Sequence, residues 1–249
     1  MGQNFLINPR ILQKIIETAD LQNDIVLEVG PGLGTLTQEL SKKAKKVIAI
    51  EKDKQMVEAL KETLKDFKNV EIIQGDILKQ NLNFKNYKVV ANIPYYLTSP
   101  LIRVLLESAN PPEEIVLMIQ KEVAQRITAQ PPKMNLLAVS IQFYAKIKIV
   151  SYISKESFWP EPKVDSAIIK IDNIKKIKKT DQKRFFKIVK AGFSSPRKQL
   201  ANNLSKKLKI NKREIKSALT ECGFNPQARA ESLRIEDWRN LIPIFQDQN

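Results

Sequence analysis

The sequence contains no histidine, one cysteine and only seven glycines in 249 residues. Without an imidazole, histidine-based acid–base catalysis, Ser-His-Asp triads and most zinc sites are excluded. The single thiol, Cys222, excludes an internal disulfide and a cysteine metal cluster, and we interpret it as a small buried apolar residue. We therefore expect no metal. Transfer of a group from an already activated donor fits this composition.

Long hydrophobic runs are also missing. The longest apolar runs, such as Ile25–Val29, are far too short to span a bilayer, and Met1-Gly2-Gln3-Asn4 shows no basic-then-apolar signal pattern. The apolar fraction of 43% still supports a folded core. The length suits one large α/β domain with a small appendage. We expect a cytoplasmic protein that binds no membrane.

Positive charge is concentrated at one end of the sequence. Residues 1–173 carry 23 basic and 20 acidic side chains, a net charge of +3, whereas residues 174–249 carry 19 and 7, a net charge of +12. A basic appendage on a near-neutral domain indicates a polyanionic partner, most simply nucleic acid. The alternative is a solvated, lysine-rich surface that only aids solubility.

Strand-like and helix-like patterns alternate through the first half of the sequence. We expect strands at residues 25–29, 46–51, 70–74, 87–91, 114–119, 145–153 and 166–171. We expect helices at residues 9–20, 35–43, 54–67, 99–108, 123–127 and 136–143. This alternation predicts an α/β fold with a mostly parallel, doubly wound, Rossmann-like sheet. In such sheets, ligands bind beyond the carboxyl ends of the strands.

The second part of the sequence is predicted to be all-α. A lysine-rich connector, residues 172–180, has no strong period, so we divide the chain into a first domain at 1–173 and a basic helical domain at 174–249. Four short helices are expected in the second domain, at residues 181–193, 197–208, 212–222 and 235–244.

Three of the seven glycines, Gly30, Gly32 and Gly34, fall within Glu28-Val29-Gly30-Pro31-Gly32-Leu33-Gly34. A glycine-poor chain that clusters glycine needs positive φ or close backbone approach there. The spacing differs from the dinucleotide fingerprint G-x-G-x-x-G. Glu51 lies at the end of the next strand, where an acid can accept both hydroxyls of a ribose. The alternative is a tight strand–helix turn with a surface glutamate.

Asp76 and Ile77 follow the third predicted strand. The Asp76 carboxylate suits the amino group of an adenine, and Ile77 could pack on the adenine ring. Taken alone, Gly75-Asp76 is equally a simple turn. Because Gly30, Glu51 and Asp76 each follow a strand at the same edge of the sheet, we favour a ribose-bearing cofactor.

Asn92-Ile93-Pro94-Tyr95 follows the fourth strand and offers an amide, a fixed carbonyl and an aromatic face. Asn92 Oδ1 and the Pro94 carbonyl could accept the two protons of an adenine N6 amine, which favours a pyramidal nitrogen with its lone pair free for a methyl donor. Pro94 pre-sets the loop, and stacking on Tyr95 is worth roughly 1–3 kcal/mol per base. The alternative is a strand-end turn with a packed tyrosine. The segment favours methyl transfer to the amino nitrogen of a nucleobase.

Taken together, these segments resemble the ribosomal RNA adenine N6,N6-dimethyltransferases of the KsgA type. The resemblance covers nearly the whole chain and is carried by Gly2–Leu6, Glu28–Gly34, Glu51, Asp76, Asn92–Tyr95, Phe158–Ser166, Phe193–Leu200 and Arg229–Leu233. The last segment favours this family over the macrolide-resistance methylases of large-subunit RNA. Family members usually carry a basic leader before the first segment, whereas this sequence begins at Met1-Gly2.

The resemblance implies a class I methyltransferase fold and S-adenosyl-L-methionine as cofactor. It implies that Asn4 and Leu6 help to close over the cofactor and that Phe158 lies by the target base. The expected catalytic residues are Asn92, Pro94, Tyr95 and Phe158. The expected cofactor-binding residues are Asn4, Leu6, Gly30, Gly32, Glu51, Asp76, Ile77 and Asn92.

The substrate that the resemblance implies is a pair of adjacent adenosines in the 3′-terminal hairpin loop of 16S rRNA, within the immature small ribosomal subunit. Each would receive two methyl groups from a monomeric enzyme. The residues expected to grip the RNA backbone are Lys183, Arg184, Lys187, Lys190, Arg197, Lys198, Lys206 and Lys207. Three alternatives stay open: a non-catalytic RNA-binding assembly factor, a 23S rRNA adenine methylase of the macrolide-resistance type, and a DNA adenine methyltransferase.

Overall fold

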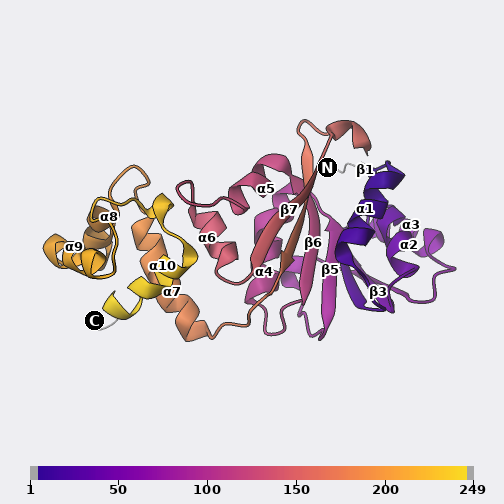
Figure 1. Cartoon of the computed structure of the whole chain (residues 1–249). Coiled ribbons are helices and arrows are strands. Elements are labelled where there is room, and N and C mark those ends of the chain that lie inside the picture. The colour runs from indigo at the N-terminus through magenta and orange to yellow at the C-terminus, as the bar shows by residue number, and fades with distance from the viewer. Residues whose placement is uncertain (1–4, 246–249) are drawn as a thin grey trace. The chain divides into compact units, whose positions relative to one another are not determined.

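A computed structural model describes residues 5–245 (Figure 1). Its main sheet contains β2 (Ile25–Val29), β3 (Lys46–Glu51), β4 (Val70–Gln74), β5 (Tyr87–Asn92), β6 (Glu114–Gln120), β7 (Lys146–Ile153) and β9 (Ser166–Asp172). The strand order is β4-β3-β2-β5-β6-β9-β7. Neighbours from β4 to β6 are parallel, and β9 runs antiparallel to both β6 and β7. The predicted mostly parallel α/β sheet is confirmed.

Helices precede, separate and follow the parallel strands. They are α1 (Pro9–Ala19), α2 (Thr35–Ser41), α3 (Lys54–Thr63), α4 (Thr98–Glu107) and α5 (Lys121–Ile127). The helix α1 begins where Asn8 accepts a hydrogen bond from the Arg10 amide at 3.1 Å, with Pro9 in the first turn. Asp53 caps α3 in the same way, through the Gln55 amide at 2.8 Å.

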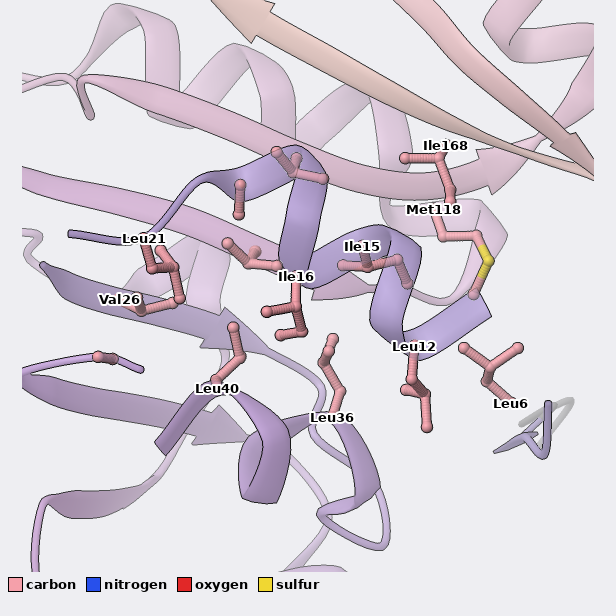
Figure 2. Packing of buried hydrophobic residues seen from close by; sticks show 14 of the residues in the cluster. Leu6, Leu12, Ile15, Ile16, Leu21, Val26, Leu36, Leu40, Met118 and Ile168 are labelled. Atoms are coloured by element: carbon pink, nitrogen blue, oxygen red, sulfur yellow. The ribbon is translucent and has the colours of Figure 1, made fainter. Parts of the chain in front are cut away.

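The apolar face of α1 lies in the core beside the sheet. Its buried residues Leu12, Ile15 and Ile16 recur at helical spacing. Figure 2 shows these side chains among Leu36 and Leu40 of α2 and Met118 and Ile168 of the sheet. Burial of this stripe holds the N-terminal helix beside the strands that carry the candidate site.

A small second sheet was not expected from the sequence. Strand β1 (Phe5–Leu6) pairs antiparallel with β8 (Phe158–Trp159), with Phe5 opposite Trp159 and Leu6 opposite Phe158. The Ile7 amide extends the pairing by donating to the Ser157 carbonyl at 3.1 Å. Two-residue strands carry no periodic pattern, so only the folded chain reveals them. Their pairing brings Phe158 next to Leu6.

The helical part contains α6 (Leu136–Gln142), α7 (Lys179–Gly192), α8 (Leu200–Leu208), α9 (Lys212–Glu221) and α10 (Ile235–Leu241). The chain folds into two compact units. The first contains the residues up to Gln125 together with Ala145–Lys176, and the second contains Arg126–Tyr144 together with the residues from Ile177 onward. Among the described helices, none is long and apolar enough to cross a membrane.

Aromatic packing explains why residues 126–144 group with the C-terminal helices. The Phe143 ring stacks on Phe185 of α7, with ring centroids 3.9 Å apart and planes 20° apart. Arg239 Nη2 of α10 donates to the Phe143 carbonyl at 3.0 Å, and the Met134 amide donates to the Glu231 carbonyl at 3.0 Å. The predicted division at residue 173 leaves this segment in the first domain, whereas these contacts lie within the second unit.

Candidate functional site

A cavity of about 580 Å³ opens beyond the carboxyl ends of β2, β3 and β5. This volume falls in the usual range of roughly 300–1,000 Å³ for small-molecule sites. The sequence-predicted residues that line it are Leu6, Gly30, Gly32, Glu51, Asp76, Ile77, Asn92, Pro94, Tyr95 and Phe158. Asn4 lies outside the described residues. The structure therefore brings the predicted cofactor and base residues of the described chain to one cavity, while their individual roles stay predictions.

The glycine turn adopts the backbone that its composition predicts. Gly30, Gly32 and Gly34 have φ values of +67°, +60° and +83°, a region that other residues rarely adopt. Close approach adds a second requirement, because a Cβ on Gly32 would lie 3.2 Å from Phe5 Cε1. A Cβ on Gly30 would lie 3.6 Å from Pro94 Cδ. The glycine turn and the Asn92–Tyr95 loop therefore lie close together, with room for little more than one carbon atom between Gly30 and Pro94.

Glu51 ends β3 with its carboxylate held by backbone amides. Oε1 accepts from the amides of Lys52 at 2.8 Å and Asp53 at 3.0 Å, and Oε2 accepts from the Gly32 amide at 3.3 Å. The residue is only 4% exposed. An ionised carboxylate has about four acceptor positions, so this one can still accept from hydroxyl groups of a ligand. This fits a ribose at the end of β3.

Asp76 is an anionic acceptor at the cavity wall. Its Oδ1 accepts from the Leu78 amide at 3.1 Å, and its Oδ2 lies 3.1 Å from Lys52 Nζ. The Lys52 ammonium, together with the Leu78 amide, holds the pKa of Asp76 below its ordinary value. Because the Lys52 side chain is 71% exposed, a ligand amine can share or replace it at the Asp76 carboxylate. Ile77 is buried and adds an apolar wall beside Asp76.

Two acceptors in the Asn92–Tyr95 loop are available to a ligand. Within residues 5–245, the Asn92 side chain has no hydrogen-bond partner. The Pro94 carbonyl accepts one hydrogen bond, from the Leu97 amide at 2.9 Å, which leaves its second lone pair. The two oxygens can therefore receive the two protons of one amino group.

The Tyr95 ring is held at its far end. Its hydroxyl lies 3.0 Å from Ser166 Oγ, and Ser166 is fully buried at the start of β9. The Thr98 hydroxyl donates to the Tyr95 carbonyl at 3.0 Å. Phe158, which is buried, lines the same cavity. These contacts hold the Tyr95 residue in place, and both aromatic rings belong to the cavity that Asn92 also lines.

Glu28 is a cavity residue to which the sequence analysis gave no role. It is 1% exposed, and within the described chain its Oε2 has no hydrogen-bond partner. Burial raises the pKa of Glu28 to about 8, and the nearby charge of Glu51 acts in the same direction. The side chain is therefore mostly neutral at pH 7. The sequence offered one sign of this role, since Glu28 is an acidic residue inside the apolar run Ile25–Val29.

The predicted RNA-binding residues are all exposed on the helical unit. Lys183, Arg184, Lys187 and Lys190 lie on α7, Lys206 and Lys207 lie on α8, and Arg197 and Lys198 lie between the two helices. Buried residues of the same helices, such as Phe185 and Leu204, face the unit's core. Their exposure fits binding to a polyanion, and their contact with RNA stays a prediction. Within residues 5–245, no group of three or more His, Cys, Asp or Glu side chains is placed to hold a metal.

Solved structures share this architecture. The 23S rRNA methyltransferase ErmE matches with a TM-score of 0.81 at 28% identity, covering 98% of this chain and 100% of that one. A dimethyladenosine transferase from Plasmodium falciparum also matches with a TM-score of 0.81, at 31% identity and 98% coverage of both chains. Together with the cavity at the strand ends, these matches define the class as a Rossmann-like RNA methyltransferase.

The family follows from the sequence comparison. The chain belongs to the ribosomal RNA adenine dimethylase family, whose model matches residues 1–247. A Ribosomal RNA small subunit methyltransferase A from Dehalococcoides mccartyi is 45% identical, over 97% of this chain and 86% of the relative. A protein with the same name from Clostridium botulinum is 41% identical, over 99% of this chain and 93% of the relative. The resemblance seen in the sequence is confirmed.

Proposed function

We propose that the chain transfers methyl groups from S-adenosyl-L-methionine to N6 of two adjacent adenosines in the 3′-terminal hairpin loop of 16S rRNA. One observation carries the proposal: two oxygens that can still accept hydrogen bonds, on Asn92 and Pro94, lie in the same cavity as the glycine turn. Relatives at 41–45% identity are named for the small subunit, whereas the large-subunit methyltransferase ErmE is 28% identical. This difference favours small-subunit RNA.

Bound S-adenosyl-L-methionine would supply an electrophilic methyl group on a sulfonium. The Glu51 carboxylate would accept the ribose hydroxyls, because it is fixed by three amides and keeps acceptor capacity. Asp76 would accept from the adenine amine, and Ile77 would cover the adenine ring. The glycines would let the backbone approach the ligand closely. Leu6 and Asn4 would close over the bound cofactor, as the family resemblance implies.

The target amine would be held by the loop at the end of β5. Asn92 Oδ1 and the Pro94 carbonyl would accept its two protons and direct its lone pair away from them. Tyr95, fixed through Ser166, would stack on the base, and Phe158 would lie beside it. The product ammonium loses its proton readily to water. No residue of the chain has to act as a strong base, which fits the absence of histidine.

The RNA would be gripped by the helical unit. Bases in loops can be splayed out and stacked on aromatic side chains, unlike those inside a duplex. The basic side chains of α7 and α8 would bind the surrounding phosphates. The reaction would take place on the immature small subunit, with the chain acting as a cytoplasmic monomer.

Replacing Asn92 with Ala tests the proposal. We expect turnover to fall by roughly 10²–10³, by analogy with the loss of one positioned polar group. The affinity for S-adenosyl-L-methionine, measured by isothermal titration, should change only a few-fold, since the glycine turn, Glu51 and Asp76 stay intact. Asn240→Ala, at an exposed position of α10, is the matched control.

Near-normal turnover of Asn92→Ala would remove the role of Asn92. A folded wild-type protein that binds no S-adenosyl-L-methionine, with and without RNA, would remove the cofactor assignment itself. The two results can be told apart, because the first tests how Asn92 holds the target amine and the second tests whether the protein binds the methyl donor.

A further inference from the structure

Two large aromatic side chains stand exposed beside the cavity. Tyr96 is 78% exposed and Trp159 is 69% exposed. Each follows directly on a residue that lines the cavity, Tyr95 in one case and Phe158 in the other. Trp is among the most buried residue types on average, and the other tryptophan, Trp238, is 0% exposed. The exposed indole of Trp159 is therefore a feature that the fold does not need.

The small sheet places Trp159 at the rim of the cavity. In the β1–β8 pair, Trp159 lies opposite Phe5. Side chains of directly opposite residues share one face of a sheet, with Cβ atoms roughly 4.5–5.5 Å apart. Phe5 lines the cavity, with its ring against Gly32. Trp159 therefore stands next to a cavity residue, while Tyr96 lines the mouth itself.

Two ion pairs involve charged residues of the segment that contains Trp159. Lys155 Nζ lies 2.6 Å from a Glu161 carboxylate oxygen, and Lys121 Nζ lies 3.2 Å from Asp165 Oδ2. The same segment carries the exposed Lys163, and the exposed indole of Trp159 offers a flat apolar face. Such a face suits the π-surface of a base better than a phosphate.

We propose that Trp159 forms a stacking platform for the unpaired nucleotide next to the adenosine that enters the cavity. The inference rests on the proposed function, and it extends it from the reacting base to its neighbour. A loop that presents two adjacent adenosines must hold the second base outside the cavity while the first one reacts. An aromatic side chain directly beside the cavity residues gives that base a place to stack.

Trp159→Ala tests the platform in steady-state methyl transfer to unmethylated small ribosomal subunits and to an unmethylated loop oligoribonucleotide. Base–aromatic stacking corresponds to a change in affinity of about 5- to 150-fold, so we expect KM for RNA to rise within that range. Affinity for S-adenosyl-L-methionine and thermal stability should be unchanged, because the side chain is exposed. Trp159→Phe should restore most of the loss. Tyr152→Ala is the control, at an exposed aromatic residue of β7 whose ring centroid lies 5.5 Å from Lys121 Nζ.

An oligoribonucleotide with an abasic site beside the target adenosine provides a double-mutant cycle. The wild type should lose about the same factor on this RNA as Trp159→Ala loses on intact RNA, and the two changes should not add. Fluorescence gives an independent reading, because Trp159 is exposed and Trp238 is buried. Intact RNA should quench the wild-type emission and leave that of Trp159→Phe unchanged.

An unchanged KM in Trp159→Ala, or fully additive losses in the cycle, would overturn the platform while methyl transfer by the wild type stood. A loss seen only on assembled subunits, and not on protein-free RNA, would also overturn it, in favour of contact with a ribosomal protein. Absence of methyl transfer by the wild type to unmethylated small ribosomal subunits would remove the proposed function, and the platform with it.

Discussion

Replacing Glu28 with Gln removes an ionisable group from the buried wall of the cavity and keeps the size of the side chain. Burial raises the folded-state pKa of Glu28 from its ordinary 4.5 to about 8. Between these values the folded protein holds a proton that the unfolded chain releases. The contribution of this group to stability is therefore complete below pH 4.5 and is lost as the pH rises to about 8.

The size of the effect follows from the two pKa values. Each pH unit within the window costs the folded state at most about 1.4 kcal/mol. Between pH 6 and pH 8, Glu28 should lower the free energy of unfolding by about 2 kcal/mol. The amide side chain of the Glu28→Gln variant cannot ionise and carries no such dependence. The interval from pH 6 to pH 8 suits this measurement because the chain has no histidine, so no imidazole titrates there.

Urea unfolding of the cofactor-free protein at pH 6 and pH 8 measures this difference. The wild type should lose about 2 kcal/mol more than Glu28→Gln over the interval. Glu58→Gln is the control, at a glutamate of α3 whose side chain is 61% exposed, and it should match the wild type. Equal pH dependence in the wild type and Glu28→Gln would refute the reasoning and show that Glu28 is ionised in the folded protein.

Two further predictions concern packing and cofactor affinity. In Gly192→Ala, the new Cβ would clash with the indole of the fully buried Trp238 and would lie 2.9 Å from Leu200 Cδ1. We therefore expect the free energy of unfolding of the helical unit to fall by about 1–3 kcal/mol. An unchanged free energy in a urea titration would contradict this close packing of Gly192 against Trp238. In Asp76→Asn, the carboxylate is replaced by a weaker acceptor, so the Kd for S-adenosyl-L-methionine in isothermal titration should rise by about ten-fold, the effect of losing one charged hydrogen bond, while turnover at saturating cofactor stays close to that of the wild type. An unchanged Kd would show that Asp76 does not bind the cofactor.

The strands were predictable because buried parallel strands have a simple local pattern. The runs at residues 25–29, 46–51 and 70–74 are continuous or nearly continuous apolar segments bounded by turn residues, and the structure has strands with these bounds. Helix ends were less predictable, since α3 ends at Thr63 and not at Phe67. The β1–β8 pair joins residues more than 150 positions apart in the sequence, and no local pattern encodes such a pairing.

The same contrast holds for the site. Glu51, Asp76 and Asn92 were predictable because parallel strands place their carboxyl ends at one edge of a sheet. The ion pair of Asp76 with Lys52 and the contact of Tyr95 with Ser166 were not, because they depend on side-chain packing across separate elements. The neutral state of Glu28 depends on the same packing, since its burial is a property of the folded cavity.

Transfer of tritiated methyl groups onto unmethylated small ribosomal subunits, followed by mapping of the labelled nucleotides, tests the central claim most directly. We predict label on N6 of two adjacent adenosines in the 3′-terminal hairpin loop, with about two methyl groups on each, and almost none with Asn92→Ala. Label on other nucleotides, or equal label with Asn92→Ala, would contradict the account.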